Sequence, residues 1–154
     1  MKTYGPIDDF TLIEIYPDIQ ITRDNADHYR GLAEGRLLIN HCRSCGTWIY
    51  PHRPACPECW SWDVRADEVS GLGTVFMWTT LMQQREPSAP HEPVPVAAVE
   101  LVEQKGLRYL SRIINCAPEA IAHDMPVQLA WIMIEGLAWP AFEPVEPTGW
   151  GAAA

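Results

Sequence analysis

Four of the five cysteines form two pairs, and this arrangement is the strongest chemical signal in the chain. Cys42 and Cys45 are separated by two residues, as are Cys56 and Cys59, which gives the motif C-x2-C-x10-C-x2-C. A tight turn with this spacing directs both thiolates of a pair toward one metal, and two such turns supply the four sulfurs of a tetrahedral zinc site. Because four sulfurs fill the coordination shell, we expect one structural zinc ion without an open position for water or substrate.

Paired cysteines can also form disulfides or a redox pair, and whether the protein resides in a reducing compartment distinguishes these alternatives from a metal site. The first ten residues include Asp8 and Asp9 and lack the apolar core of a signal peptide. No stretch approaches the roughly 20 apolar residues that span a bilayer. We therefore expect a cytoplasmic protein without a membrane partner, where reduced thiols favour a metal over two disulfides or a redox pair. An iron or iron–sulfur site of the same spacing is the main alternative.

Charge restricts the partners that the chain can have. The 154 residues include 11 basic and 20 acidic side chains, for a net charge of −9. Nucleic acid is therefore an unlikely partner, because neutralisation of phosphates supplies most of that affinity. The segment 36–62 is an exception, since it carries Arg36, Arg43 and Arg53 against Glu58 alone. These arginines are candidates for an anion site, although three arginines in such a segment can also arise by chance.

The elements that must position the cysteines are short. Residues 24–34 carry apolar side chains at spacings of three and four and predict an amphipathic helix, which Thr22 or Asp24 would cap and Gly35 would end. Upstream, Thr11 to Ile15 predicts a short strand or extended arm. We divide the chain into an N-terminal arm and helix (1–35), a zinc ribbon (36–62), a barrel (63–135) and a tail rich in proline and tryptophan (136–154).

The region after the cysteines is rich in β-branched and aromatic residues, with breaks at Gly, Pro and polar residues. It predicts five strands, at Val64 to Val69, Thr74 to Met82, Val94 to Val102, Leu107 to Ile114 and Val127 to Glu135. An antiparallel barrel of five strands is typical of the OB-fold. The predicted fold class is mainly β: an N-terminal helix, a rubredoxin-like zinc ribbon and a five-stranded OB-fold barrel.

The remaining candidates for chemistry are isolated. His41 and His52 flank the cysteine pairs, and with four sulfurs available we expect them outside the coordination shell. We interpret Cys116 as a buried free thiol, because no base stands beside it in the sequence. No nucleophile, phosphate-loop or metalloprotease motif is present. We therefore predict no catalytic residue in this chain.

Several motifs in order resemble one known family. The predicted helix is followed by Gly35 to Ile39, by both cysteine pairs with the lead Tyr50 to Ala55, by Gly71 to Val75, and by Asp124 to Val127. The combination, over roughly residues 18 to 135, resembles the zinc-ribbon/OB-fold family associated with acyl-CoA metabolism, long described as a domain of unknown function. Asp124 stands where that family commonly has glycine.

The resemblance implies a role within a complex. Members of the family are small partner subunits of thiolase-like enzymes, either retro-aldolases that cleave acyl-CoA side chains, as in steroid degradation, or acyltransferases. We favour the aldolase. The partner subunit would carry the catalytic residues, the assembly is expected to be a hetero-oligomer of two plus two chains, and Arg36, Arg43 or Arg53 could bind the phosphates of an acyl-CoA. The alternatives are a stand-alone acyl-CoA-binding module and a protein that binds single-stranded nucleic acid.

Overall fold

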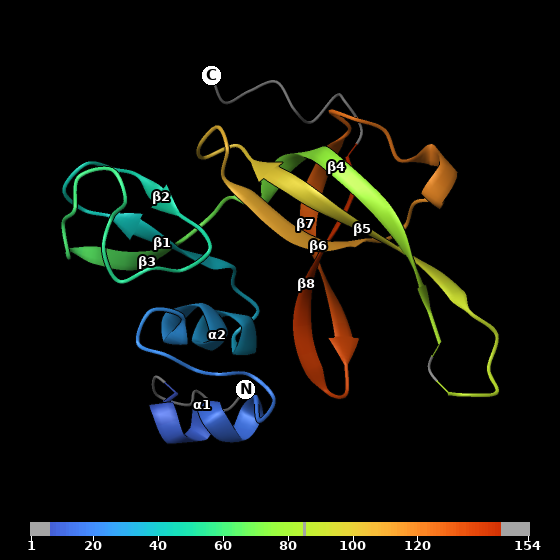
Figure 1. Cartoon of the computed structure of the whole chain (residues 1–154), viewed down its shortest axis with the longest axis horizontal. Coiled ribbons are helices and arrows are strands. Elements are labelled where there is room, and N and C mark those ends of the chain that lie inside the picture. The colour runs from blue at the N-terminus through green and yellow to red at the C-terminus, as the bar shows by residue number, and fades with distance from the viewer. Residues whose placement is uncertain (1–6, 85, 146–154) are drawn as a thin grey trace. The chain divides into compact units, whose positions relative to one another are not determined.

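A computed structural model describes residues 7–84 and 86–145 of the chain (Figure 1). Its contacts divide the chain into two units, one ending at Val69 and the other beginning at Ser70. The first unit contains two helices and a small sheet, and the second contains a closed barrel. Within the described ranges, no helix is long and apolar enough to cross a membrane. The fold is mainly β, as the sequence predicts.

The first helix, α1 (Asp9–Ile15), occupies the segment for which a strand or extended arm is expected. Asp8 caps it, because its carboxylate accepts a hydrogen bond from the backbone N–H of Thr11 at 2.9 Å. Leu12 is fully buried, and Pro17 follows the helix. The expectation of an extended segment is therefore wrong, since a side-chain cap and one apolar anchor outweigh the β-branched residues of this helix.

The second helix, α2 (Ala26–Ala33), lies within the predicted range, but its first turn differs from the expectation. Neither Thr22 nor Asp24 is the N-cap; Asn25 holds that position, and its side chain accepts from the backbone N–H of Thr22 at 2.7 Å. Gly35 follows the helix with a φ of 72°, a conformation that glycine adopts without steric cost. A Cβ at Gly31 would meet Leu38 at 2.6 Å, so glycine lets the helix approach β1 closely.

Three strands make up the sheet of the first unit: β1 (Leu38–Cys42) lies between β2 (Trp48–Ile49) and β3 (Val64–Glu68). All pairings are antiparallel, and the register sets Cys42 opposite Val64. The predicted strand at Val64 to Val69 is therefore real, but its assignment to the barrel is wrong. It completes the ribbon sheet, and the ribbon extends beyond the expected end at residue 62.

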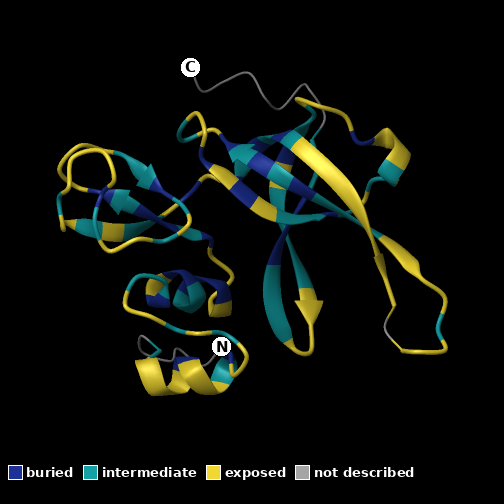
Figure 2. Ribbon diagram, viewed as in Figure 1, coloured by how far each residue is buried: buried dark blue, intermediate teal, exposed yellow. Residues whose placement is uncertain are grey.

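The barrel is closed in the order β4-β5-β6-β8-β7. Four of its strands match predicted ones: β4 (Leu72–Gln83), β5 (Glu92–Leu101), β6 (Arg108–Ile113) and β7 (Pro126–Ile134). A short 3-10 helix, η1 (Pro118–Ala120), precedes β7. Buried side chains alternate with less buried ones at the start of β4 and the end of β5, whereas the second half of β4 is exposed throughout (Figure 2). The largest fully buried side chains of the barrel are Val75, Val99, Leu101, Val127 and Phe142.

The fifth barrel strand is β8 (Leu137–Pro144), which falls in the segment interpreted as a tail. It pairs antiparallel with β7 along its whole length and parallel with β6 at Ala141 and Phe142. The barrel therefore extends past the expected boundary at residue 135. The rest of the predicted tail, residues 146–154, lies outside the described residues.

Asp124 illustrates how the barrel tolerates a departure from the expected motif. Its φ is 60°, in the left-handed region, and its backbone N–H donates to the carbonyl of Val75 at 2.9 Å. Glycine adopts this conformation most easily, which accounts for glycine at the corresponding position of the family motif. Aspartate is among the residues that tolerate it best.

Candidate metal centre

The four paired cysteines lie on two turns of the same construction. In the first turn, the backbone N–H of Gly46 donates to the carbonyl of Cys42 at 2.9 Å, and in the second turn Trp60 donates to Cys56 at 3.0 Å. The residue after each pair has a positive φ, 77° at Gly46 and 61° at Trp60. The hydroxyls of Ser44 and Ser61 lie 2.7 Å apart and join the two turns. The local backbone therefore directs all four sulfurs to one side.

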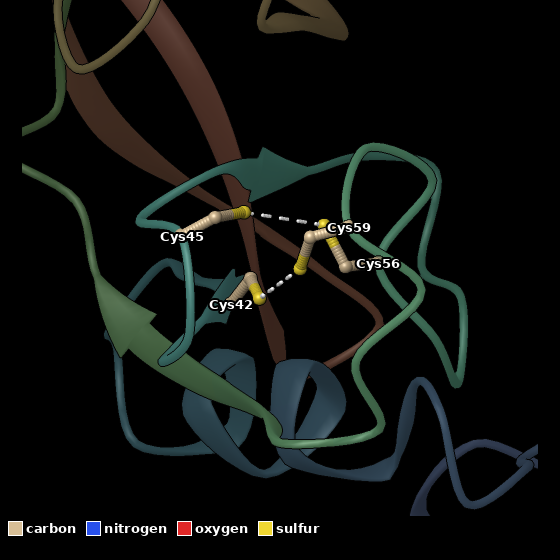
Figure 3. A group of neighbouring side chains, drawn as sticks. All are labelled: Cys42, Cys45, Cys56 and Cys59. Carbon is tan, nitrogen blue, oxygen red and sulfur yellow. Dashed lines mark hydrogen bonds between the residues drawn. The ribbon is translucent and has the colours of Figure 1, made fainter.

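The four sulfurs converge on one point (Figure 3). All of them lie within 4.8 Å of one another, and the Cys42–Cys59 and Cys45–Cys56 sulfur pairs are each separated by 3.6 Å. A disulfide requires about 2.05 Å, so these are free thiols. Sulfurs that each stand about 2.3 Å from a central zinc ion would be about 3.8 Å apart. The donor set therefore fits one tetrahedral zinc, and four sulfurs leave no position for substrate.

Four neighbouring thiolates repel one another, and a bound cation would offset this repulsion. The side chain of Thr47, 3.1 Å from the sulfur of Cys45, lowers the pKa of that thiol to about 6. The backbone N–H of Ser61 favours the thiolate of Cys59, but the neighbouring thiols of Cys45, Cys42 and Cys56 together with burial outweigh it and raise the pKa of Cys59 to about 12. Thiolates this close repel one another, so complete ionisation of the cluster requires a compensating positive charge such as Zn²⁺.

Neither neighbouring histidine lies in the sulfur cluster, in agreement with the sequence interpretation. The ring of His41 stacks on Trp48 with centroids 4.2 Å apart, and its Nε2 lies 3.1 Å from the carbonyl oxygen of Gly46. Its Nδ1 lies 2.8 Å from a carboxylate oxygen of Asp67. His52 lies against His28 of α2, with ring centroids 4.6 Å apart. His41 thus supports the first turn from outside, and His52 packs against the helix.

The three arginines proposed to bind phosphate occupy different environments. Arg36 forms an ion pair with Glu68 at 2.9 Å, and Arg43 forms one with Asp67. Arg53 instead lines a small polar pocket of about 100 Å³ in the first unit. Arg23 and Arg65 line the same pocket. The structure therefore does not bring the three predicted arginines together, and it associates Arg53 with two arginines that the sequence analysis did not select.

The buried side chain of Asn40 shapes this pocket. Its amide Nδ2 donates to the backbone carbonyls of Asp24 and Arg53, at 3.1 and 3.4 Å. These bonds hold the segments that carry Arg23 and Arg53 against β1, and the ring of Trp62 lines the pocket beside them. An asparagine directly after the apolar run Leu37 to Ile39 was the available signal for this site.

Cys116 is half-buried and lies outside the sulfur cluster, with its sulfur 3.5 Å from the carbonyl of Ala117. His123 is directed elsewhere, with Nδ1 2.8 Å from the carbonyl oxygen of Phe76. These contacts do not pair Cys116 with His123 as a nucleophile and base, and the free thiol is less buried than the sequence interpretation expects.

Two family models together cover more than half of the chain. Residues 30–65 match "ChsH2, rubredoxin-like zinc ribbon domain", and residues 66–131 match "ChsH2, C-terminal OB-fold domain". The chain belongs to the ChsH2 (DUF35) family. The ChsH2 zinc-ribbon match includes all four cysteines of the cluster, which supports a single structural zinc. The border between the two matches falls inside β3, whereas the structure assigns the whole of β3 to the ribbon sheet.

Individual relatives agree with this assignment. A "probable enoyl-CoA hydratase alpha subunit" of Thermomonospora curvata is 36% identical over 85% of the chain, which spans 40% of that relative's length. A "DUF35 domain-containing scaffold protein" of Pyrococcus furiosus is 32% identical over 61% of the chain and 67% of its own length. A solved chain of an "Ltp2-ChsH2(DUF35) aldolase" is 35% identical, with a TM-score of 0.72 over 82% of this chain and 98% of that one.

Proposed function

We propose that this chain is a non-catalytic zinc-ribbon/OB-fold subunit that binds and stabilises a thiolase-like acyl-CoA enzyme in a cytoplasmic hetero-oligomer. The observation that carries the proposal is the similarity to a chain of an aldolase that contains ChsH2. The metal centre agrees with it, because four sulfur ligands leave no site for chemistry on the zinc. The name of that relative supports an aldolase over an acyltransferase; a steroid side chain is one candidate substrate.

Copurification tests the partner role. The chain is tagged in its native host, purified gently, and its companions are identified by mass spectrometry. We expect a thiolase-like subunit in equal amount, which would support a two-plus-two assembly, and we expect neither chain alone to cleave or form a thioester-linked carbon–carbon bond. A clean monomer without such a companion would contradict the proposal and would favour a stand-alone acyl-CoA-binding module.

We further propose that Arg53 helps to bind the phosphates of the CoA thioester. Arg36 and Arg43 are already paired with carboxylates, whereas within the described residues Arg53 forms no ion pair. Its pocket is also lined by Arg23 and Arg65, of which Arg65 pairs with Asp63, and by the carboxylates of Asp24 and Asp27. Guanidinium groups bind phosphate strongly because they offer paired donors in a plane. The ring of Trp62 at the same pocket adds a flat apolar surface.

Kinetics of the reconstituted complex test the role of Arg53. Arg53→Ala should raise KM for the acyl-CoA about ten-fold, with little change in kcat, because it removes one charge-assisted phosphate contact of roughly 1.5 kcal/mol. Arg36→Ala is the matched control, since its guanidinium is neutralised by Glu68 and its loss should change KM less than two-fold. An unchanged KM for Arg53→Ala would remove CoA binding from the proposed role.

A further inference from the structure

A groove lies between two hairpins that extend from the barrel, one formed by β4 and β5 and the other by β7 and β8 (Figure 1). Within the described residues, β5 pairs with β6 from Val96 onward and β7 pairs with β4 at Leu72 to Thr74, so the first hairpin projects past both neighbours. The second hairpin is the paired tip 132–139. The groove has a volume of about 670 Å³, within the roughly 300–1,000 Å³ of small-molecule sites.

The lining of the groove is apolar where β6 and β7 end. Its apolar side chains are Ile114, Ile132, Met133 and Ile134. Met133 is 66% exposed and Ile134 is 37% exposed, so packing of the barrel core does not account for these two side chains. Exposed apolar side chains around a concave surface are typical of a binding site, and the flexible side chain of methionine adapts to the shape of a ligand.

One positive charge stands beside this apolar surface. The guanidinium of Arg112 on β6 lines the groove, 3.5 Å from the amide oxygen of Gln83, and within the described residues it forms no ion pair. Arg108, on the same strand, is instead paired with Glu100 at 3.1 Å. A guanidinium without a counter-ion attracts an anion, and its planar fork fits a carboxylate through two parallel hydrogen bonds.

The other polar groups of the lining restrict the ligand further. Glu135 lines the same groove, so Arg112 can balance one negative charge but not the nearly two charges of a phosphate monoester. OB-fold barrels bind oligonucleotides near the loops of these two hairpins, and bases are held there by stacking on aromatic rings. The described residues of the lining include no aromatic ring, which disfavours such a ligand.

We propose that the groove between the two hairpins binds a small molecule with an apolar body and a single carboxylate, such as a medium-chain fatty acid. The carboxylate pairs with Arg112 beside the amide of Gln83, and the chain lies on Ile132 and Met133. The groove shares no residue with the arginine pocket of the first unit. The inference goes beyond the proposed function, because it assigns a ligand that the chain binds without a partner subunit.

An NMR titration of the full chain with decanoate tests the site. We expect saturable amide shifts at the end of β4, at the end of β6 and at the tip of β7. Arg112→Gln should raise Kd for decanoate about ten-fold and change Kd for decanol, which lacks the charge, less than about two-fold. Arg108→Gln is the matched control, because Arg108 is paired with Glu100, and it should bind decanoate as the wild type does.

The apolar part of the groove has its own variant. Met133→Ser should raise Kd for decanoate and for decanol alike, by about three-fold, because it removes a contact with the chain and leaves Arg112 in place. Met133 is largely exposed, so the fold should be retained, and the dispersion of the NMR spectrum checks this for every variant.

Three results would overturn the inference. Amide shifts that do not saturate, or that lie outside the groove, would mean adventitious binding of the fatty acid. An equal Kd for decanoate in the wild type and in Arg112→Gln would remove the carboxylate from the recognised ligand. Tighter binding of decyl phosphate than of decanoate would mean that the groove selects a dianion. None of these results depends on the thiolase-like subunit, so copurification tests the proposed function separately.

Discussion

At the scale of single residues, the metal centre depends on cysteines in two different environments. Cys42 and Cys56 are buried, whereas Cys45 and Cys59 are exposed. The buried pair serves both as ligands and as part of the small ribbon core, which otherwise contains Ile49 and Val64. A core of this size cannot fold a segment by itself, so the metal supplies most of its stability.

Replacing one buried ligand should therefore unfold the ribbon. Cys56→Ser leaves three sulfurs, and we expect the zinc content to fall from one per chain to less than about 0.2, with loss of ordered structure in the ribbon; structural zinc contributes on the order of 10 kcal/mol in small domains. Metal analysis and circular dichroism measure the two effects. Cys116→Ser is the matched control, because Cys116 lies outside the cluster, and it should retain both zinc and fold.

At the scale of elements, the sequence predicted the clustered cysteines and most of the strands. It did not predict which sheet β3 joins, or that β8 is a strand, because both depend on pairing with strands elsewhere in the chain. The alternation of β3 is that of any half-buried strand, so nothing local assigns it to β1 rather than to the barrel. β8 was missed because Pro140 and Pro144 argue against a central strand. The carbonyl of Pro140 accepts from the hydroxyl of Ser111 on β6, so its missing N–H lies on that side, and the pairing with β7 is preserved.

In the candidate site, too, features set by local spacing were predictable and features set by long-range pairing were not. The zinc ligands depend on spacing along the chain, which the sequence states directly. The arginine pocket depends on Asn40 joining two loops that are distant in sequence, and Arg36 and Arg43 are neutralised by β3, whose position the sequence does not reveal. The pairing of β3 with β1 therefore determines which arginines are neutralised by carboxylates, and the sequence alone does not reveal that pairing.

The packing of α2 on the ribbon predicts a pH dependence. Burial lowers the pKa of His52 to about 3, and burial also lowers the pKa of His28 on α2. Both nitrogens of His52 are buried without a hydrogen-bond partner among the described residues. The unfolded chain takes up a proton at His52 below its ordinary pKa of 6.5, and the folded chain does not. The contribution of His52 to the free energy of unfolding is therefore fully present above pH 6.5, and it decreases as the pH falls from 6.5 toward 3.

Substitution of His52 by Phe should remove its share of this dependence. Between pH 7 and pH 5 the wild type should lose about 2 kcal/mol more unfolding free energy than His52→Phe, from 1.36 kcal/mol per pH unit. The phenyl ring fills the same space without leaving a polar atom unpaired, so stability at pH 7 should be retained. Urea unfolding of the zinc-bound proteins at both pH values measures this, and zinc linkage cancels in the comparison. Equal losses in both proteins would show that His52 is not held neutral.

At the scale of the whole molecule, the two units depend on different sources of stability. The unit that ends at Val69 contains the complete sulfur cluster, whereas the barrel has fully buried apolar side chains of its own, among them Val75, Val99 and Phe142. A closed barrel leaves no unpaired sheet edge along its paired strands, and none of the four clustered cysteines belongs to it. We therefore expect zinc to stabilise the fold of the first unit and to have little effect on the stability of the barrel.

Removal of zinc from the full chain should open the first unit selectively. After treatment with a strong chelator, we expect amide hydrogen exchange in β1 and β3 to accelerate about a hundred-fold or more. The reason is that β1 leads into the first cysteine turn and β3 follows the second, so the metal that joins the turns also keeps the two strands paired. Exchange in β5 and β6 of the barrel should change less than about three-fold. Hydrogen exchange read out by mass spectrometry resolves the two regions within one molecule.

Two comparisons make this prediction decisive. Cys56→Ser should reproduce the chelated pattern without chelator, and addition of zinc to the chelated wild type should restore slow exchange in β1 and β3. Uniform acceleration across both units would instead mean that the chain unfolds cooperatively and that the zinc stabilises the barrel as well.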